Sequence, residues 1–556
     1  MKIFESVRFH ILLSILFVIL YFGIVLDFSL SKIFISHVDE STSFSSDFKR
    51  LVFYFLIIFI SFLFIKRKYR FFILPFYIVW TVQLLNFSNT GVFLSPLTIE
   101  NLGEYSSIGL SLLFKFVFLF LLSISLFVYH LIVIPEIRLS CLWKIAAPAV
   151  LSSALFIFFT VRSSYPVAQF IESFYIVYLN NYAEIERNSG EQFLKNFKNT
   201  FISKGIENPV NPKDERLNLI ILFTEGLSDR VISQELTPNL YKLRQRSLYF
   251  ENYYNHTAPT FRGLRGQLIS GFVRAANSDV NSMSQRRLDL TFKNSSESLP
   301  SIFNDNNYDT VFLGPHPSES KIYLYMKATG FTNVQTSDDY KSSKKHYPDL
   351  SDHDIFNFLS EIVENEMRKE RNFFISMYNV ETHHGMTVKE HIYGNGDNDF
   401  YNKFYNFDYW LGNFFNWFNS SKVSENTVVV ITADHSTYAV PSFENTFRFK
   451  SHTRSMFVDK IPFIVYKKGV INAPLVYNAH GRNSLCLAPT LLDLMGLDDV
   501  KNHFLGHTLF DDTDSEFEHL SLIGSDSIET SEYEYHDIVL EAEIREKLEK
   551  FFGFSG

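Results

Sequence analysis

The run Leu-Asn-Leu-Ile-Ile-Leu-Phe-Thr-Glu at 217–225 constrains the fold most, because an unbroken apolar stretch ends abruptly on a carboxylate. It follows a turn-forming segment at 208–212 and is rich in Ile and Leu, as expected of a parallel strand covered on both faces. Ligands of open α/β sheets sit just beyond the carboxyl ends of such strands. The sequence therefore predicts a buried strand that brings Glu225 to a site.

Further apolar runs alternate with helical stretches after residue 217, a spacing typical of βαβ units around a mostly parallel sheet. The expected strands span 219–223, 310–313, 373–378, 427–432 and 462–466. Three of these strands run into side chains that can bind a metal. These side chains are Glu225 after the first, His383-His384 after the third, and Asp434-His435 after the fourth.

Each group also has a purely structural explanation. Glu225 suits the first turn of a helix, where an acid complements the helix dipole, and Asp434-His435 suits a helix cap. His383-His384 alone favours neither explanation. A structural explanation must be invoked three separate times, however, because all three groups follow buried strands. We therefore predict a metal site at one edge of the sheet.

Long apolar runs dominate the first third of the chain. Five of them are long enough for a helix to cross about 30 Å of hydrocarbon, at 9–28, 47–65, 71–86, 109–134 and 143–161. The basic cluster at 66–70 and the loop at 135–144 are expected in the cytoplasm. Both loops are expected on the cytoplasmic side, and successive spans cross the membrane in opposite directions. Five spans therefore place the amino terminus inside and everything after Val161 outside the cytoplasm.

We predict four parts along the chain. Residues 1–162 form a five-span transmembrane domain, 163–214 a juxtamembrane amphipathic linker, 215–510 the catalytic domain, and 511–556 an acidic tail that is packing or solvated surface. A net charge of −9 argues against nucleic acid as a partner, because that partner requires a basic stripe. Cys141 and Cys486 fall on opposite sides of the membrane, so we expect no intrachain disulfide.

Motifs spread over the outer domain resemble those of a known superfamily. In chain order they are Thr237-Pro238-Asn239-Leu240, Phe250-x-Asn252-x-Tyr254, Thr260-Phe261-Arg262-Gly263, Leu268-x-Ser270-Gly271, His384-Gly385, Asp434-His435 and Leu487-Ala488-Pro489-Thr490. Their order resembles that of the alkaline-phosphatase/sulfatase superfamily. Together with five spans, it resembles the lipoteichoic-acid-synthase type of phosphoglycerol transferases, with phosphoethanolamine transferases as cousins. The resemblance implies an α/β sulfatase-like domain, with helices on both faces of a mostly parallel sheet, after a five-helix transmembrane bundle.

The resemblance also implies roles for individual residues. It places the metal ligands on Glu225, Thr260, Asp434 and His435, with Thr260 also the nucleophile. A sulfatase would carry Cys or Ser there for conversion to formylglycine, which a threonine cannot undergo. Thr257 is the rival hydroxyl.

Elementary chemistry supports a metal beside such a hydroxyl. Its pKa lies far above neutrality, so Thr260 needs a divalent cation to attack as an alkoxide. Mn²⁺ is the expected ion, with Zn²⁺ or Mg²⁺ as alternatives. A helix N-terminus at Thr260 would add N–H groups for a phosphate. His384 matches the His-Gly element that contacts phosphate or leaving group, and we expect it to protonate the departing alkoxide.

Several other residues are candidates for substrate contacts. Lipoteichoic acid synthases carry a Phe-Trp-Asn-Arg element in their glycerol-phosphate pocket, and the corresponding region here, 314–325, lacks it. This leaves polymer synthesis open. The candidate substrate residues are His383, Arg262, His316, Lys321, His452 and His480, of which the last two also suit ordinary loop histidines.

The sequence thus predicts an enzyme of the bacterial cell (inner) membrane. It would move phosphoglycerol from phosphatidylglycerol to an extracytoplasmic glycan or lipid acceptor through a phospho-Thr260 intermediate. One alternative is phosphoethanolamine transfer to lipopolysaccharide or another envelope glycan, but such transferases usually carry several disulfides and this outer domain holds one cysteine. The other alternative is a catalytically inactive sulfatase-like regulatory protein, which has no need to retain all four metal ligands.

Overall fold

The computed structural model describes residues 42–90, 93–94, 99, 110–133, 170–171, 173–175, 208–211, 215–273, 297–340, 349–439, 441–447, 457–497, 500, 502–522, 528–530 and 537–538. The chain divides into two compact units. The first comprises Met1–Ile99, Ile108–Leu179 and Ala439–Arg448, and the second comprises Glu100–Ser107, Asn180–Tyr438 and Phe449–Gly556.

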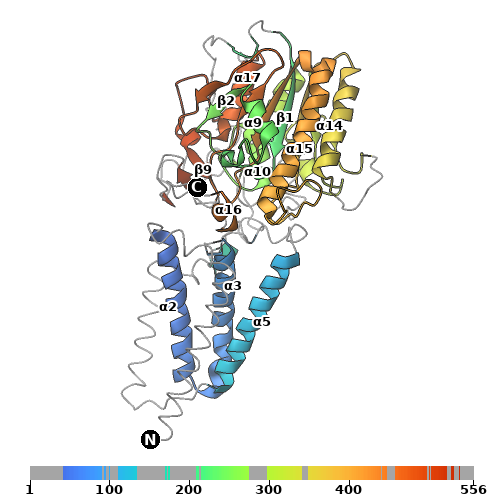
Figure 1. Ribbon diagram of the computed structural model, residues 1–556. Helices are drawn as coiled ribbons and strands as arrows, with labels where there is room; N and C mark the ends of the chain where they lie inside the picture. The colour runs from blue at the N-terminus through green and yellow to red at the C-terminus, as the bar shows by residue number, and fades with distance from the viewer. Residues whose placement is uncertain are drawn as a thin grey trace, which may run out of the picture. The chain divides into compact units, whose positions relative to one another are not determined.

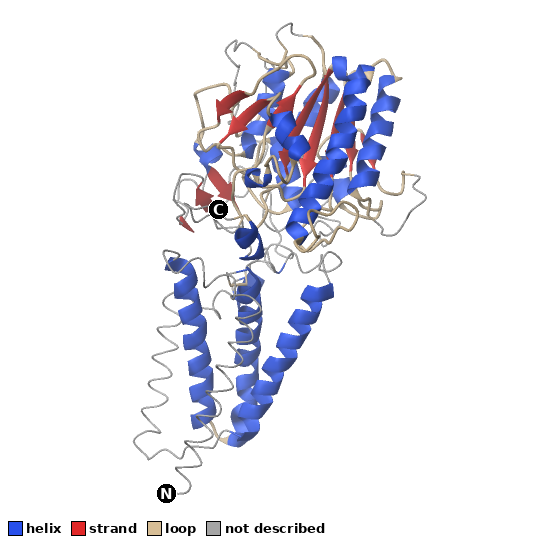
Figure 2. Cartoon of the chain, in the orientation of Figure 1, coloured by secondary structure: helices blue, strands red, loops and turns tan. Residues whose placement is uncertain are grey.

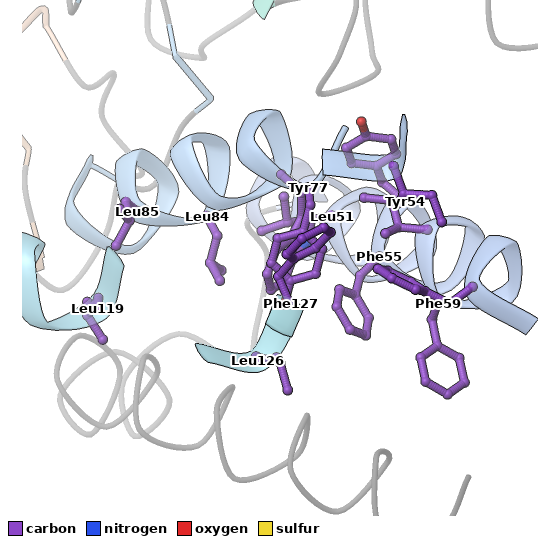
Figure 3. Close-up of a cluster of buried hydrophobic side chains, with 14 of the residues drawn as sticks. Leu51, Tyr54, Phe55, Phe59, Tyr77, Leu84, Leu85, Leu119, Leu126 and Phe127 are labelled. Carbon is purple, nitrogen blue, oxygen red and sulfur yellow. The ribbon is translucent and has the colours of Figure 1, made fainter. Parts of the chain in front are cut away.

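Apolar helices make up much of the described part of the first unit: α2 (Thr42–Phe64), α3 (Leu74–Thr90) and α5 (Leu110–Val133). This unit also contains the short polar helix α16 (Pro441–Thr446) and, between α2 and α3, a 3₁₀ helix, η1 (Arg67–Ile73). Aromatic side chains of α2, α3 and α5 pack together (Figure 3), and the rings of Phe55 and Trp80 lie 4.6 Å apart.

These helices overlap the second, third and fourth predicted spans, whereas the first and fifth lie outside the described residues. Among the helices that the structure describes, none is both long and apolar enough to cross a membrane. The five-span arrangement stays a prediction.

The second unit is organised around an eight-stranded sheet in the order β4-β3-β5-β1-β6-β7-β2-β8. The strands are β1 (Asn218–Thr224), β2 (Leu248–Glu251), β3 (Asp309–Leu313), β4 (Asn333–Gln335), β5 (Phe373–Tyr378), β6 (Thr427–Ala433), β7 (Ile464–Tyr466) and β8 (Leu475–Asn478). All pairs are parallel except those of β7, which runs antiparallel to β6 and β2. The predicted mostly parallel sheet is confirmed.

Helices lie on both sides of this sheet (Figures 1 and 2). One group packs α15 (Asp399–Ser420) against α14 (Asp352–Met367) and α9 (Pro238–Arg244). The other packs α10 (Thr260–Ile269) against α17 (Leu487–Leu494) and α12 (Leu299–Asp305), and α13 (Ile322–Ala328) adjoins β4. The 3₁₀ helices of this unit are η3 (Asp229–Val231), η6 (Lys422–Glu425), η7 (Ser484–Cys486) and η8 (Glu516–His519).

The three central strands place their carboxyl ends together. Every residue of β1, β5 and β6 is buried, as expected of strands covered on both faces. Phe223 of β1 is in register with Tyr378 of β5 and with Thr432 of β6. The polar residues that follow these strands therefore meet at one edge of the sheet.

The described part of the acidic tail packs against the second unit. A small antiparallel sheet joins β9 (Leu520–Leu522), β10 (Ile528–Thr530) and β11 (Asp537–Ile538). The buried Glu518 accepts hydrogen bonds from the N–H of His507 at 2.8 Å and from its Nδ1 at 2.5 Å, and lies 3.6 Å from Arg482 Nη1. The expected helical run at 538–552 lies outside the described residues beyond Ile538.

This packing predicts that the tail stabilises the domain through Glu518. Glu518→Ala leaves the buried Arg482 cation without its neighbouring carboxylate and the His507 donors without their acceptor, so we expect a loss of about 3–5 kcal/mol in the free energy of unfolding. The exposed neighbour Glu516 supplies the control, and Glu516→Ala should change stability by less than about 0.5 kcal/mol. Denaturant titrations in which the two variants unfold alike would contradict this role.

Candidate active site

Glu225, Asp434 and His435 meet where β1 and β6 end. One ligand atom from each lies within 4.8 Å of the others, and the three side chains are buried. His435 Nε2 is 3.3 Å from Glu225 Oε1 and 3.5 Å from Asp434 Oδ2. Two carboxylates and an imidazole in this arrangement suit Mn²⁺ or Zn²⁺.

Backbone N–H groups bind one carboxylate oxygen of Asp434 and leave its other oxygen without a donor among the described residues. Its Oδ1 accepts the N–H groups of Gly226 at 2.8 Å and of His435 at 2.7 Å. Within the described part of the chain, its buried Oδ2 accepts no hydrogen bond. A buried carboxylate oxygen normally has a partner, so this atom fits a metal ligand.

Residues after β5 hold the backbone of Glu225. Asn379 Oδ1 accepts the Glu225 N–H at 3.0 Å, and Thr382 Oγ1 donates to the Glu225 carbonyl at 2.7 Å. All three central strands therefore contribute to one site.

The charges of this group favour a divalent cation. Burial raises the pKa of Asp434, and the neighbouring Glu225 charge raises it further. Burial opposes a charged His435, but Asp434 and Glu225 outweigh that effect and raise its pKa to about 9. A bound divalent cation would favour two ionised carboxylates and a neutral imidazole here, because metal ligands must be deprotonated.

Thr260 is the first residue of α10 and donates its hydroxyl to Glu225 Oε2 at 2.8 Å. It is half-buried, whereas all later residues of α10 are buried. The helix N-terminus offers backbone N–H groups beside the hydroxyl, and such groups bind phosphate. The predicted nucleophile and the three other predicted ligands thus lie together.

Gly263 allows α10 to approach this closely. A Cβ at that position would lie 2.0 Å from the Asp434 carbonyl oxygen, so any other residue would push the helix away from β6. Gln267 Nε2 donates to the carbonyls of Ala433 at 2.9 Å and Asp434 at 3.2 Å. The glycine of the Thr-x-Arg-Gly pattern is therefore required for steric reasons.

Thr257, the rival hydroxyl, has a structural role. It is buried, donates to the Leu522 carbonyl at 2.7 Å, and accepts from Arg262 Nη2 at 2.8 Å. Arg262 also donates to Leu522 at 3.0 Å and is fully buried. The structure therefore places Arg262, a predicted substrate contact, among these groups and away from solvent.

His383 and His384 lie in the turn that follows β5, where Gly385 adopts a φ of 92°. The ring of His384 stacks on Phe400, with centroids 5.9 Å apart. Burial lowers the pKa of His384 to about 3, with further contributions from Lys403 and His383. At this pKa the imidazole is neutral near pH 7, so it does not carry the extra proton that the predicted acid role requires.

The remaining substrate candidates do not join this group. Both ring nitrogens of His316 are engaged, Nδ1 at 2.9 Å from Asp349 Oδ1 and Nε2 at 3.2 Å from the Tyr378 hydroxyl. Lys321 stands at the amino end of α13. His480 is exposed after β8, which lies four strands from β1, or roughly 19 Å at the usual strand spacing. His452 lies outside the described residues.

Three residues near the site, Phe400, Lys403 and Tyr438, were not identified from the sequence. Phe400 and Lys403 belong to the first turn of α15 and are buried, so they read as core positions of an amphipathic helix. Tyr438 stacks on His435, with centroids 5.0 Å apart and planes 15° from parallel. Its place three residues after a predicted ligand was the only available hint.

A second pair of buried carboxyl groups, Asp352 and Glu381, is linked to the site through Asn379. The N–H of Asp352 donates to Glu381 Oε2 at 2.7 Å, and Asn406 Nδ2 lies 3.2 Å from a carboxylate oxygen of each. Asn379, which holds Glu225, donates to Asp352 Oδ1 at 2.9 Å. Burial raises the pKa of both acids, that of Glu381 to about 7. The pair therefore tends to keep a proton.

Comparisons with known proteins agree with the fold. The sulfatase family model matches residues 218–497, just over half of the chain. A protein of the alkaline phosphatase superfamily from Vibrio parahaemolyticus has the same fold, with a TM-score of 0.51 at 19% identity over 67% of this chain and 97% of the other. The lipoteichoic acid synthase LtaP from Listeria monocytogenes gives a TM-score of 0.47 at 14% identity over 65% and 95%. The comparison with curated proteins gave no significant match.

The chain belongs to the sulfatase family. The superfamily comprises hydrolases and transferases of phosphate and sulfate esters, and its members are typically dependent on divalent metals.

The donor set predicts how metal binding depends on single residues. Glu225→Ala and Asp434→Ala should each abolish stoichiometric metal and the rise in melting temperature that a bound metal gives. Glu251, an exposed glutamate at the end of β2, supplies the control, and Glu251→Ala should bind metal normally. Elemental analysis of the purified variants measures this directly, and a site variant that kept its metal would remove that residue from the ligand set.

The carboxyl pair predicts a pH dependence of stability. The pKa of Glu381 rises from its usual 4.5 to about 7 in the folded protein, so the folded state binds more protons than the unfolded state between these values. Stability should therefore fall as pH rises from 4.5 to 7 and level off above. Denaturant titrations across this range should show a smaller slope in Glu381→Gln, but not in Glu361→Gln on the exposed side of α14. Equal slopes in all three proteins would refute the shift.

Proposed function

We propose that the protein is a metal-dependent phosphotransferase that moves phosphoglycerol from phosphatidylglycerol to an extracytoplasmic glycan or lipid acceptor. One observation carries the proposal: the Thr260 hydroxyl lies at a helix N-terminus, 2.8 Å from Glu225 and beside the buried group with Asp434 and His435. A nucleophile, a metal site and phosphate-binding N–H groups are thereby combined.

The residue type favours phosphate over sulfate chemistry. A sulfatase needs Cys or Ser at the nucleophile position for conversion to formylglycine, and Thr260 cannot be converted. A threonine hydroxyl forms a phosphoester by direct displacement at phosphorus, with the alkoxide of the donor lipid as the leaving group. A bound divalent cation would stabilise the Thr260 alkoxide and neutralise phosphoryl charge.

The reaction divides into two displacements. In the first, Thr260 Oγ1 bonds to phosphorus while the bond to the diacylglycerol oxygen breaks, and the threonine proton ends on diacylglycerol. In the second, the acceptor hydroxyl gives its proton to the neutral His384 and bonds to phosphorus, which releases Thr260. His384 then returns the proton to Thr260, so each turnover regenerates both groups.

A membrane location is part of the proposal. It is supported by the long apolar runs of the first third of the sequence and by large apolar side chains that the first unit exposes, including Phe71 at 62%, Phe72 at 65% and Leu121 at 59%. Exposed apolar surface of this kind marks an interaction surface. Anchoring there would give an extracytoplasmic active site access to lipid donors.

The proposal predicts different outcomes for the two threonines. Thr260→Ala should abolish release of diacylglycerol from labelled phosphatidylglycerol with Mn²⁺, and Thr260→Ser should retain part of it because the hydroxyl remains. Thr257→Ser keeps the hydrogen bonds to Leu522 and Arg262, so it should be active. We expect Thr257→Ala to be unstable, because it removes a buried hydrogen-bond partner of Arg262.

Wild-type release by a folded Thr260→Ala protein would exclude the covalent mechanism. Absence of release by the wild type with any phospholipid would contradict the proposed transferase and favour an inactive binding protein.

A further inference from the structure

Lys403 is a buried lysine beside the site that the mechanism above does not use. Its side chain is 1% exposed, in the first turn of α15. Nζ donates to the carbonyl of His383 at 3.1 Å and lies 4.5 Å from the centre of the Phe400 ring. Among the described residues, no carboxylate lies within ion-pair distance of it.

The carbonyl that Lys403 contacts belongs to the turn that carries His384. His383 donates its N–H to Val380 at 2.9 Å, and its carbonyl also accepts the N–H of Met386 at 3.1 Å. His383 thus takes part in two successive backbone turns, and Lys403 adds a side-chain hydrogen bond to the His383 carbonyl. Asn406 of α15 also bonds to Glu381 in the segment after β5 at 3.2 Å, whereas Lys403 bonds to the backbone of the turn itself.

The imidazole of His384 lacks the usual hydrogen-bonded support. No described group bonds to its buried Nδ1, whereas active-site histidines are commonly oriented through that atom. What fixes the ring is its stack on Phe400, and the Lys403 ammonium lies over the same phenyl ring. The start of α15 thus contacts the ring of His384 through Phe400 and the preceding carbonyl, that of His383, through Lys403.

A buried ammonium is costly and needs opposite charge nearby. Burial lowers the pKa of Lys403 to about 7, while the charges of Glu225 and Asp399 oppose that shift. Glu225 belongs to the site and Asp399 to the same helical turn. The charge of Lys403 is therefore favoured by one acid of the site and by one acid of its own helix.

We propose that Lys403 is a positioning residue for the reaction assigned to this site: through the His383 carbonyl it fixes the turn that presents His384, with Phe400 as the second support. The role rests on the proposed function, because His384 is the group that it aligns. Lys403 does not touch the substrate, since its hydrogen bond and its burial direct it to the protein.

Two substitutions separate its hydrogen bond from its charge in the full-length protein. Lys403→Met removes both, whereas Lys403→Gln removes the charge and retains a donor for the His383 carbonyl. Lys467, a buried lysine after β7, gives the control Lys467→Met. The probe is bis(4-nitrophenyl) phosphate with Mn²⁺, a phosphodiester whose hydrolysis needs no lipid donor.

We expect Lys403→Met to lower kcat about 100-fold with little change in KM, the size of effect that a small misplacement of a catalytic group produces. Lys403→Gln should lose markedly less, and Lys467→Met should match the wild type. Equal kcat values for Lys403→Met and the wild type, or for Lys403→Met and Lys403→Gln, would overturn the positioning role.

A second measurement stays informative if the wild type proves inactive and the proposed function fails. The pH dependence of His384 modification by diethyl pyrocarbonate, followed by peptide mass spectrometry, reports its protonation. Lys403 from α15 and His383 from the same turn are the neighbouring groups that lower the pKa of His384, and Glu225 acts on Lys403 in the opposite direction. In Lys403→Met and Lys403→Gln, loss of the positive charge should raise the pKa of His384 and so move the midpoint of modification to higher pH. In Lys467→Met the midpoint should not move. If the midpoint does not move in the Lys403 variants, Lys403 has no electrostatic effect on His384 and serves only as a core residue.

Discussion

The structure depends on keeping two carboxylates, Glu225 and Asp434, buried side by side. Like charges in a buried site repel, and each also loses its hydration. The fold compensates with groups from neighbouring strand ends: the N–H groups of Gly226 and His435 donate to Asp434, and the His435 imidazole lies 3.3 Å from Glu225. Parallel strands make this arrangement possible, because β5, β1 and β6 end at the same edge.

The helix that carries the nucleophile is placed by the same strand ends. Gly263 lets α10 rest against the Asp434 carbonyl, and Gln267 bonds to that segment. On the other side, Arg262 and Thr257 bind the Leu522 carbonyl. The chain after residue 510 thus steadies the helix whose first residue is Thr260, although the two are far apart in sequence.

The sequence carried enough information for five of the eight strands, the three central ones included, and for the residues that meet at their carboxyl ends, but not for β2, β4 and β8. Glu225 and Asp434-His435 were predictable because each follows an apolar run that is recognisable locally, and the order of the motifs matched the superfamily. The burial of Arg262 was not predictable, because sequence does not reveal that an arginine in a helix packs against a segment about 260 residues later. The choice between Thr257 and Thr260 rested on the resemblance until the hydrogen bonds were seen.

Lys403 and Phe400 could not be predicted for a different reason. They follow His384 by 16–19 residues, and their spacing matches the apolar face of α15, so only the packing of that helix on the His383–His384 turn reveals them. The protonation of His384 likewise depends on burial and on Lys403. Sequence identifies which residues carry the chemistry, whereas their electrostatic roles depend on contacts between distant segments.

The covalent step at Thr260 is the central claim, and peptide mass spectrometry tests it most directly. Full-length protein is incubated with phosphatidylglycerol and Mn²⁺ without acceptor, quenched in acid and digested. The account predicts a glycerophosphate adduct on Thr260 that disappears when acceptor is added before quenching. Diacylglycerol release with Thr260 unmodified throughout, or an adduct on another residue, would contradict it.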